Sequence, residues 1–234
     1  MHYHWEPLSE GVYRCRLPFL DVTVGLVKGL RSILLIDCGT TLLEAAAITE
    51  DVLALTGGAV TDVVMTHHHF DHILGSAGFA DAELWATPAV AEALTTRVAD
   101  VRAHALGYGA DAAELDRAIA AVRAPDHQLL RAELDLGDRT VLVEHPGRGH
   151  TDHDLVIVVP PTTPGRRAVM FCGDLVEESA DPAIDTGSDV AAWPAALDRV
   201  LALGGPEAIY VPGHGAVVDA QFVRSQRDWL AARD

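Results

Sequence analysis

The feature that most constrains this chain is a histidine-rich stretch, residues 67–72, which reads His-His-His-Phe-Asp-His and directly follows the apolar run 63–65. The apolar run predicts a buried strand. Side chains two apart on an extended backbone point to the same side. We therefore expect His67 and His69 to converge on one metal ion while His68 points away.

The second half of this stretch predicts another metal position. Asp71 and His72 come where the chain should turn into a helix, so we expect them to face a second ion beside the first. Imidazole and carboxylate groups are the ligands that suit zinc and its neighbours. The alternative is a run of surface histidines that caps a helix, and the rest of the chain decides between the two.

Length and charge limit the classes of function. The chain has 234 residues, of which 49% are hydrophobic and 22% charged, so we expect one globular domain over residues 1–234 rather than disorder. The formal net charge is −17, which repels a phosphate backbone. We therefore expect a small-molecule substrate and no nucleic-acid partner.

The termini and cysteines predict a compartment. Residues 1–6 show no basic region followed by an apolar core, and no apolar run reaches the length of a bilayer span, so we expect no secretory leader and no membrane partner. The three cysteines are odd in number and far apart, which favours a reducing, cytoplasmic setting. The sequence leaves the oligomeric state open, with a homodimer as one alternative.

A repeated event organises the chain: a strand ends in a residue that can bind a metal. A strand at 32–36, a helix from the Thr41/Glu44 capping box to about residue 55, and a strand at 59–65 form one strand-helix-strand unit. Open α/β sheets build their sites at the carboxyl ends of such strands. The residues at these strand ends are Asp37, His67, His150, Asp174 and His214.

Between the two halves lies an alanine-rich helical excursion, about residues 88–124. We expect two helices there, about 89–105 and 110–122, split by Gly107-Tyr108-Gly109. Strands resume near 128–136. The excursion is either a lid or pocket wall, or simple surface packing.

Five short elements together resemble the metallo-β-lactamase superfamily. They occur in the family's order and span nearly the whole chain: Asp37-x-Gly39, His67-x-His69-x-Asp71-His72, Gly149-His150-Thr151, Gly173-Asp174 and Gly213-His214-Gly215. The resemblance implies an α+β fold of the αββα four-layer type, in which two mixed β-sheets pack face to face and helices cover the outer faces. It also implies a dinuclear metal site at one edge of the sandwich.

The resemblance assigns each ligand to a metal. The implied ligands are His67, His69 and His150 for the first ion, Asp71, His72 and His214 for the second, and Asp174 as the bridge. Asp37 is implied to steady the site without binding a metal. One departure is that β-lactamases of one subclass use cysteine as a second-site ligand, where this chain has Asp174. We expect Cys172, two residues away, to be a small buried hydrophobe.

This ligand set predicts a metal-dependent hydrolase. Five neutral imidazoles and two carboxylates surround two divalent ions, for which zinc is our first expectation and iron or manganese the alternatives. Zinc lowers the pKa of a bound water to about 7, so a metal-bound hydroxide is available at neutral pH without a serine or cysteine nucleophile. We expect it to attack an ester-like bond (a lactone, thioester or carboxylic ester), with Asp71 orienting its proton.

Other functions remain alternatives. A mononuclear iron persulfide dioxygenase of the same superfamily binds its ion through two histidines and one carboxylate. β-Lactamase-like activity is the second alternative, disfavoured because residues 175–178 after Asp174 offer no cation for a carboxylate. Hydroxyacylglutathione hydrolases share the metal motifs but carry a C-terminal helical domain, for which the segment after Gly215 is too short. A non-catalytic binding module would not need the complete ligand set.

A few further side chains are candidates for lesser roles. Tyr108 and Tyr210 are candidate donors to a substrate carbonyl, although tyrosine more often serves packing. His104 and His127 read as surface groups. His153, near His150, is a candidate for contact with the site or for a plain loop residue.

Overall fold

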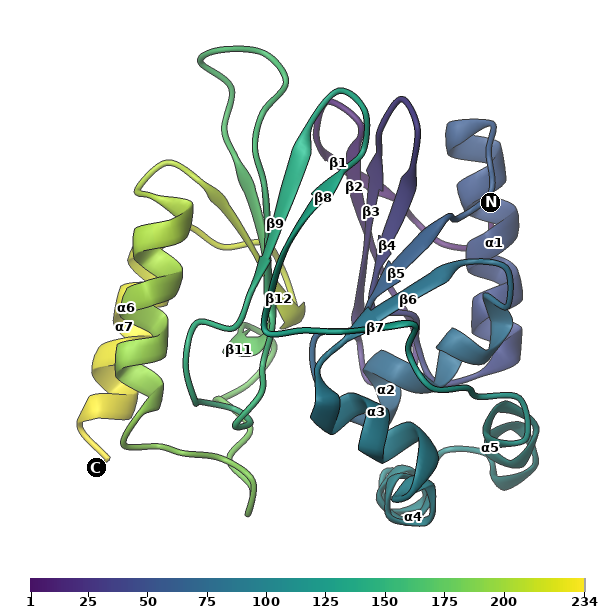
Figure 1. Cartoon of the computed structure of the whole chain (residues 1–234). Helices are drawn as coiled ribbons and strands as arrows, with labels where there is room; N and C mark the ends of the chain where they lie inside the picture. The colour runs from purple at the N-terminus through teal and green to yellow at the C-terminus, as the bar shows by residue number, and fades with distance from the viewer. Residues whose placement is uncertain (234) are drawn as a thin grey trace.

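Four layers make up the fold, in the order helix, sheet, sheet, helix (Figure 1). They are seen in a computed structural model that describes residues 1–233. The two sheets face each other, α1 (Leu42–Thr56) lies outside one of them, and α6 (Trp193–Gly204) and α7 (Ala220–Ala231) lie outside the other. The αββα four-layer sandwich expected from the sequence is therefore confirmed.

The first sheet has its strands in chain order. They are β1 (Glu6–Ser9), β2 (Val12–Arg16), β3 (Thr23–Lys28), β4 (Ile33–Ile36), β5 (Asp62–Val64), β6 (Glu83–Ala86) and β7 (His127–Gln128). The pairing is antiparallel up to β4 and parallel from there on. The parallel half needs crossovers, and α1 is the first of them.

The second sheet is mixed as well. Its order is β12 (Ile209–His214), β11 (Val169–Glu177), β10 (Val156–Val159), β9 (Thr140–Glu144) and β8 (Arg131–Asp135). Only the β11–β12 pair is parallel. The single strand expected near 128–136 is wrong: the chain crosses between the sheets at Leu129 and Leu130, so β7 and β8 belong to different sheets.

Apolar side chains fill all three spaces between the layers. One cluster joins the first sheet to α1 and includes Ile48. A second lies between the sheets and includes Phe171, and a third joins the second sheet to α6 and α7 around Trp193. Full burial of one such side chain contributes about 1.5–3 kcal/mol. The three clusters thus hold the two sheets and the outer helices together as one packed unit.

The start and end of α1 follow from its sequence. The Thr41 hydroxyl accepts from the Glu44 N–H at 3.1 Å, and the Glu44 carboxylate accepts from the Thr41 N–H at 3.0 Å. This is the capping box that the sequence predicts. Gly57 ends the helix in the left-handed region, with φ 78°.

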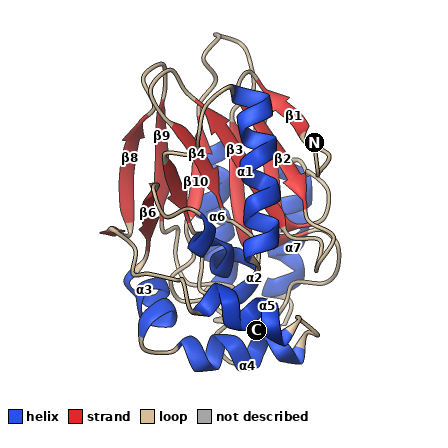
Figure 2. Ribbon diagram, turned by 90° about the vertical axis from the view of Figure 1, so that its right-hand side faces the viewer, coloured by secondary structure: helices blue, strands red, loops and turns tan. Residues whose placement is uncertain are grey.

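The helical excursion forms three helices, so the expected two are wrong. They are α3 (Pro88–Thr95), α4 (Val98–Gly107) and α5 (Ala112–Ile119), gathered at one end of the sandwich near the short α2 (Phe70–Ile73), with the 3₁₀ turn η1 (Leu74–Gly78) following α2 (Figure 2). The break falls at Thr95 and Thr96, whose hydroxyls donate to the carbonyls of Ala91 and Glu92. Such β-branched residues with back-bonded hydroxyls weaken a helix.

Two further observations concern membrane spans and the cysteines. Within residues 1–233, no helix is long and apolar enough to cross a membrane. Cys15, Cys38 and Cys172 are buried free thiols. Cys172 packs in the cluster with α6 and α7, as expected for a small hydrophobe.

Candidate metal centre

The strand ends bring the candidate ligands to one edge. β4 and β5 are parallel neighbours, so Asp37 and His67 follow them at the same end of the sheet. His69 caps α2, which places Asp71 and His72 in its first turn. The other three ligand candidates come from the second half of the chain: His150 from the loop before β10, Asp174 from within β11 and His214 from the end of β12.

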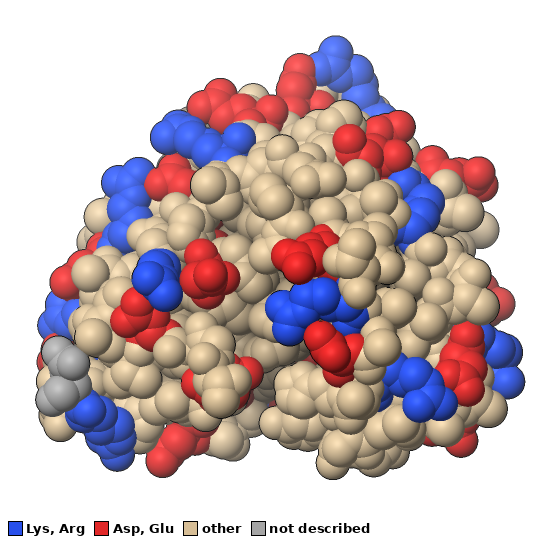
Figure 3. Space-filling view, turned by 60° about the horizontal axis from the view of Figure 1, so that its bottom comes forward, with Lys and Arg blue, Asp and Glu red and all other residues tan. Residues whose placement is uncertain are grey.

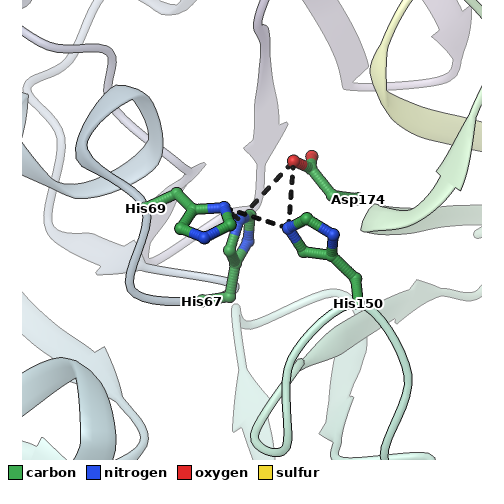
Figure 4. Close-up of side chains that lie close together, drawn as sticks. All are labelled: His67, His69, His150 and Asp174. Atoms are coloured by element: carbon green, nitrogen blue, oxygen red, sulfur yellow. Dashed lines mark hydrogen bonds and ion pairs between the residues drawn. The ribbon is translucent and has the colours of Figure 1, made fainter. Parts of the chain in front are cut away.

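The first cluster consists of three imidazoles and a carboxylate. His67 Nε2 and His150 Nε2 each lie 3.0 Å from Nδ1 of His69. Oδ2 of Asp174 lies 3.6 Å from His67 Nε2 and 3.4 Å from His150 Nε2. Figure 4 shows the four side chains converging from different elements on one point. All four are buried.

The second cluster shares Asp174 with the first. Nε2 of His72 lies 3.2 Å from Asp174 Oδ1, and Nε2 of His214 lies 3.4 Å from Asp174 Oδ2. Oδ2 of Asp71 lies 3.5 Å from His214 Nε2 and 3.7 Å from His72 Nε2. The structure thus brings together all seven residues that the sequence singled out, in two groups around one carboxylate.

Hydrogen bonds behind the rings decide which nitrogens face inward. Nδ1 of His72 lies 2.8 Å from Asp37 Oδ2, and Nδ1 of His214 lies 2.8 Å from the Leu20 carbonyl oxygen. Nδ1 of His150 lies 3.1 Å from the Ala183 carbonyl oxygen. Because these oxygens can only accept, each Nδ1 carries the proton and each Nε2 presents a lone pair to the cluster.

The remaining two rings follow the same rule. The Thr66 hydroxyl donates to Asp37 Oδ2 at 2.9 Å, so it accepts from Nδ1 of His67 at 3.0 Å. His69 is turned round: its Nδ1 faces the cluster, and its Nε2 lies 3.4 Å from Oδ2 of Asp185. All five imidazoles therefore have a rear acceptor and an inward lone pair.

Burial and neighbouring charges set the protonation of the site without a metal. Burial lowers the pKa of His67 well below its ordinary value. Burial alone would also lower the pKa of His72, but the surrounding carboxylates, first Asp174, raise it well above the ordinary value. Burial would raise the pKa of Asp174, yet His72 and His214 hold it well below its usual range. The site thus calls for positive charge, which a divalent cation can supply in place of protons.

The residues present fit such cations. Oδ1 of Asp174 is buried and makes no hydrogen bond within residues 1–233. An orphaned buried carboxylate oxygen is rare in proteins and points to a missing partner. Ligand atoms on a tetrahedral zinc ion lie about 3.3 Å apart, and the contacts of the first cluster range from 3.0 Å to 3.6 Å. A Cβ on Gly213 would overlap the Asp174 carboxylate, so the backbone leaves this space open only because residue 213 is glycine.

A cavity of about 370 Å³ opens onto the cluster. It is lined by α2, by the end of α4 and by residues 179–185 of the loop after β11. Sequence reasoning missed three of its lining residues, His104, Glu177 and Asp185. His104 and Tyr108 are four apart on α4, so one helix face presents both, whereas no pattern in the sequence points to Asp185.

Some lesser expectations are settled by the contacts. His68 turns away from the ligands, and its Nδ1 lies 3.0 Å from His153 Nε2. Tyr210 is not a donor to substrate, because it is buried beside α6 and its hydroxyl donates to the Gly205 carbonyl at 2.7 Å. Tyr108 lines the cavity and keeps that role open. His104 is exposed, as expected, and its ring also lies 5.3 Å from that of His69 at the cavity.

Comparisons with known proteins agree with this geometry. A family model described as the metallo-beta-lactamase superfamily matches residues 17–214. The chain belongs to the metallo-beta-lactamase superfamily. It is 27% identical over 173 residues (73% of this chain) to a metallo-beta-lactamase type 2 of Bacillus cereus. It is 30% identical over 198 residues (82% of this chain) to a hydroxyacylglutathione hydrolase of Fuscovulum blasticum. The chain spans 58% and 65% of the lengths of these two relatives.

Solved structures share the fold of this metallo-beta-lactamase superfamily member. The crystal structure of the DIM-1 metallo-beta-lactamase superposes with a TM-score of 0.76 at 15% identity, covering 99% of this chain and 98% of that one. A metallo-beta-lactamase from Pontibacter korlensis gives 0.71 at 18% identity, covering 99% and 100%. The chain thus combines the fold of this superfamily with two His/Asp clusters that can hold metal ions.

Proposed function

We propose that this protein hydrolyses an ester-like bond in a small molecule (a lactone, thioester or carboxylic ester) and that it uses two divalent ions, zinc foremost. The observation that carries the proposal is the position of Asp174, which lies beside both donor clusters: its Oδ2 is within 3.6 Å of imidazole nitrogens of each cluster, and its Oδ1 lies 3.2 Å from His72 Nε2. A metallo-hydrolase with one ion would not need this second cluster. The hydroxyacylglutathione hydrolase among the relatives supports an ester-like substrate.

The ligands divide into two sets around Asp174. His67, His69 and His150 would hold one ion, and Asp71, His72 and His214 the other. When bound, such ions polarise a carbonyl oxygen and lower the pKa of water to about 7. Oδ2 of Asp71, beside His72 and His214, is placed to accept a proton from the attacking water.

The cavity offers no competing nucleophile. Ser179 is the one hydroxyl-bearing aliphatic side chain among its lining residues, and it donates to Glu177 Oε1 at 2.7 Å. A serine nucleophile needs a base and a third group that orients that base, and no side chain other than Ser179 donates to Glu177 within the described residues. Water activated at the cluster is therefore the nucleophile that the residues support.

The test combines a metal count with a substrate screen. Protein purified without added metal and then loaded with zinc should hold two ions per chain and hydrolyse at least one member of a lactone, thioester and ester panel. Asp174→Ala should lose both metal and turnover while keeping its circular dichroism spectrum. His127→Ala, which changes a surface imidazole stacked on Trp85, is the matched control and should keep both.

Three outcomes would replace the proposal. Full activity and metal in Asp174→Ala would remove the bridging role. One iron per chain, with oxygen uptake on glutathione persulfide, would identify the mononuclear dioxygenase. Turnover of β-lactams alone would establish the second alternative.

A further inference from the structure

We propose that the substrate carries a positively charged group, which the acidic wall of the metal cavity selects. This inference rests on the proposed hydrolase function and names the chemical class of its substrate. Five carboxylates line the cavity, and no lysine or arginine does. Asp71 and Asp174 belong to the donor clusters and Asp185 pairs with His69, which leaves Glu177 and Asp181 for contact with the substrate.

The charge balance of the loaded cavity is unfavourable for an anion. Two divalent ions would bring four positive charges, which the four aspartates of the lining already balance, so no net positive charge is left to attract an anion. Burial raises the pKa of Glu177 to about 7, so this residue adds negative charge above that pH. The adjoining cavity of about 390 Å³ does not change this, because its Arg97 is paired with Asp100 at 3.2 Å. Figure 3 shows the face onto which this region opens, where acidic and basic side chains alternate around a central recess.

Glu177 lies beside Asp174 and His214 at the cavity and has one carboxylate oxygen without a hydrogen bond from the described residues. Its side chain is 6% exposed, yet it lines the cavity. Oε1 accepts from Ser179, whereas no hydrogen bond within residues 1–233 reaches Oε2. Oε2 is not sealed off from the cavity, so a cationic group on a bound substrate can reach it.

An aromatic side chain also lines the cavity. Tyr108 is 56% exposed, and its ring centroid lies 5.7 Å from that of Phe70 and 5.2 Å from that of His104. Exposed aromatic faces attract alkylammonium groups, and carboxylates add to that attraction. Ile184, also exposed, extends the apolar part of the wall. The combination fits a substituted ammonium better than a carboxylate or a bare hydrocarbon.

Three matched esters test the inference on the zinc-loaded protein. They are the 4-nitrophenyl esters of 4-(trimethylammonio)butanoic acid, 5,5-dimethylhexanoic acid and glutaric acid, which are cationic, neutral and anionic at nearly the same length. We expect kcat/KM to fall in that order, by about fivefold or more per unit of charge. Raising the ionic strength from about 0.02 M to about 0.5 M should shrink the ratio.

Two variants assign the preference to the cavity rather than to the overall charge of the protein. Asp181 is exposed and makes no ion pair or hydrogen bond within the described part of the chain, so Asp181→Asn leaves the fold intact. It should reduce the cation-to-anion ratio by about fivefold, and Glu177→Gln should reduce it as well. Asp81→Asn removes an exposed charge in the turn before β6 and should leave the ratio unchanged.

The outcomes separate this inference from the proposed function. Equal turnover of the cationic and glutaric esters, or a ratio that both cavity variants leave unchanged, would overturn the charge selection while hydrolysis stands. If no ester is hydrolysed, the ester-hydrolase function fails, and calorimetry still decides the charge selection. Phenyltrimethylammonium should then bind the zinc-loaded protein and bind Asp181→Asn about fivefold more weakly. The inference would be overturned if phenyltrimethylammonium did not bind the wild-type protein, or if it bound the wild type and Asp181→Asn with equal affinity.

Discussion

Nδ1 of His72 lies 2.8 Å from Oδ2 of Asp37, and this contact fixes the ring nitrogen that His72 turns toward the second donor cluster. Asp37 is itself held by the N–H of Thr66 at 2.8 Å and by its hydroxyl at 2.9 Å. It also has φ 57°, a left-handed conformation that asparagine and aspartate tolerate best. Asp37 therefore orients a metal ligand without touching the metal position.

Asp37→Asn should weaken the second metal site and spare the fold. The amide keeps the size of the side chain and its tolerance of positive φ, but it no longer provides a negative acceptor behind His72. Loss of such a partner lowers metal affinity by about 10–100-fold. Competition with a chromophoric chelator measures the two affinities. Unchanged affinity at the weaker site would show that Thr66 and the backbone suffice to hold His72.

Asp185→Asn should weaken binding of the first ion, the one that His69 would hold. Oδ2 of Asp185 lies 3.4 Å from Nε2 of His69, the only ligand imidazole that turns Nδ1 inward. Removing the carboxylate should lower the affinity of the first site by about tenfold. The same chelator titration, run beside Asp37→Asn, distinguishes the two variants by which binding step changes. A loss of affinity confined to the metal site of Asp71, His72 and His214 would contradict the assignment of Asp185 to the other site.

Much of this centre could be predicted from sequence because its ligands follow strands. Periodicity locates strand ends, and parallel strands such as β4 and β5 place those ends together, which is why His67 and Asp37 could be anticipated. Asp185 comes from an irregular loop, whose path depends on tertiary contacts rather than on any repeat. The place of His104 beside His69 could not be predicted either, because it depends on how α4 packs near α2.

Gly213→Ala should empty the site without unfolding the protein. A methyl group there would overlap the Asp174 carboxylate and displace the residue shared by both clusters. We expect loss of bound metal and of turnover, measured by metal analysis and by the panel assay. Gly107→Ala is the control: a Cβ at that helix end meets open space, so metal content should stay at the wild-type level. Full metal content in Gly213→Ala would mean that the strand shifts to accommodate the methyl.

Stability of the metal-free protein should fall as the pH rises toward 9. Burial alone would lower the pKa of His214, but Asp174 outweighs it and raises the pKa from 6.5 to about 9. A raised folded-state pKa contributes stability below pH 6.5 that is lost progressively up to about pH 9. Melting temperatures of metal-free wild type and His214→Gln should therefore converge over this range. Zinc-loaded protein should lack the trend, because the metal replaces the proton. Parallel curves for the two metal-free proteins would contradict it.

Asp51 should matter for stability alone. It lies on α1 far from the metal ligands in sequence, and it ties down the N-terminal segment by accepting from the Tyr3 N–H at 2.8 Å and from Nε1 of Trp5 at 3.0 Å. Burial would raise its pKa, but these donors and the His2 N–H lower it below the ordinary 3.8. Its contribution is thus present above about pH 4 and is lost as the pH falls through the folded-state pKa.

Asp51→Ala leaves the buried indole N–H of Trp5 unpaired, so urea unfolding at pH 7 should show a loss of about 2–3 kcal/mol in the free energy of unfolding, with metal content unchanged. Asp51→Asn, which keeps one acceptor, should lose less, and an equal loss in the two variants would mean that the charge rather than the indole contact carries the effect.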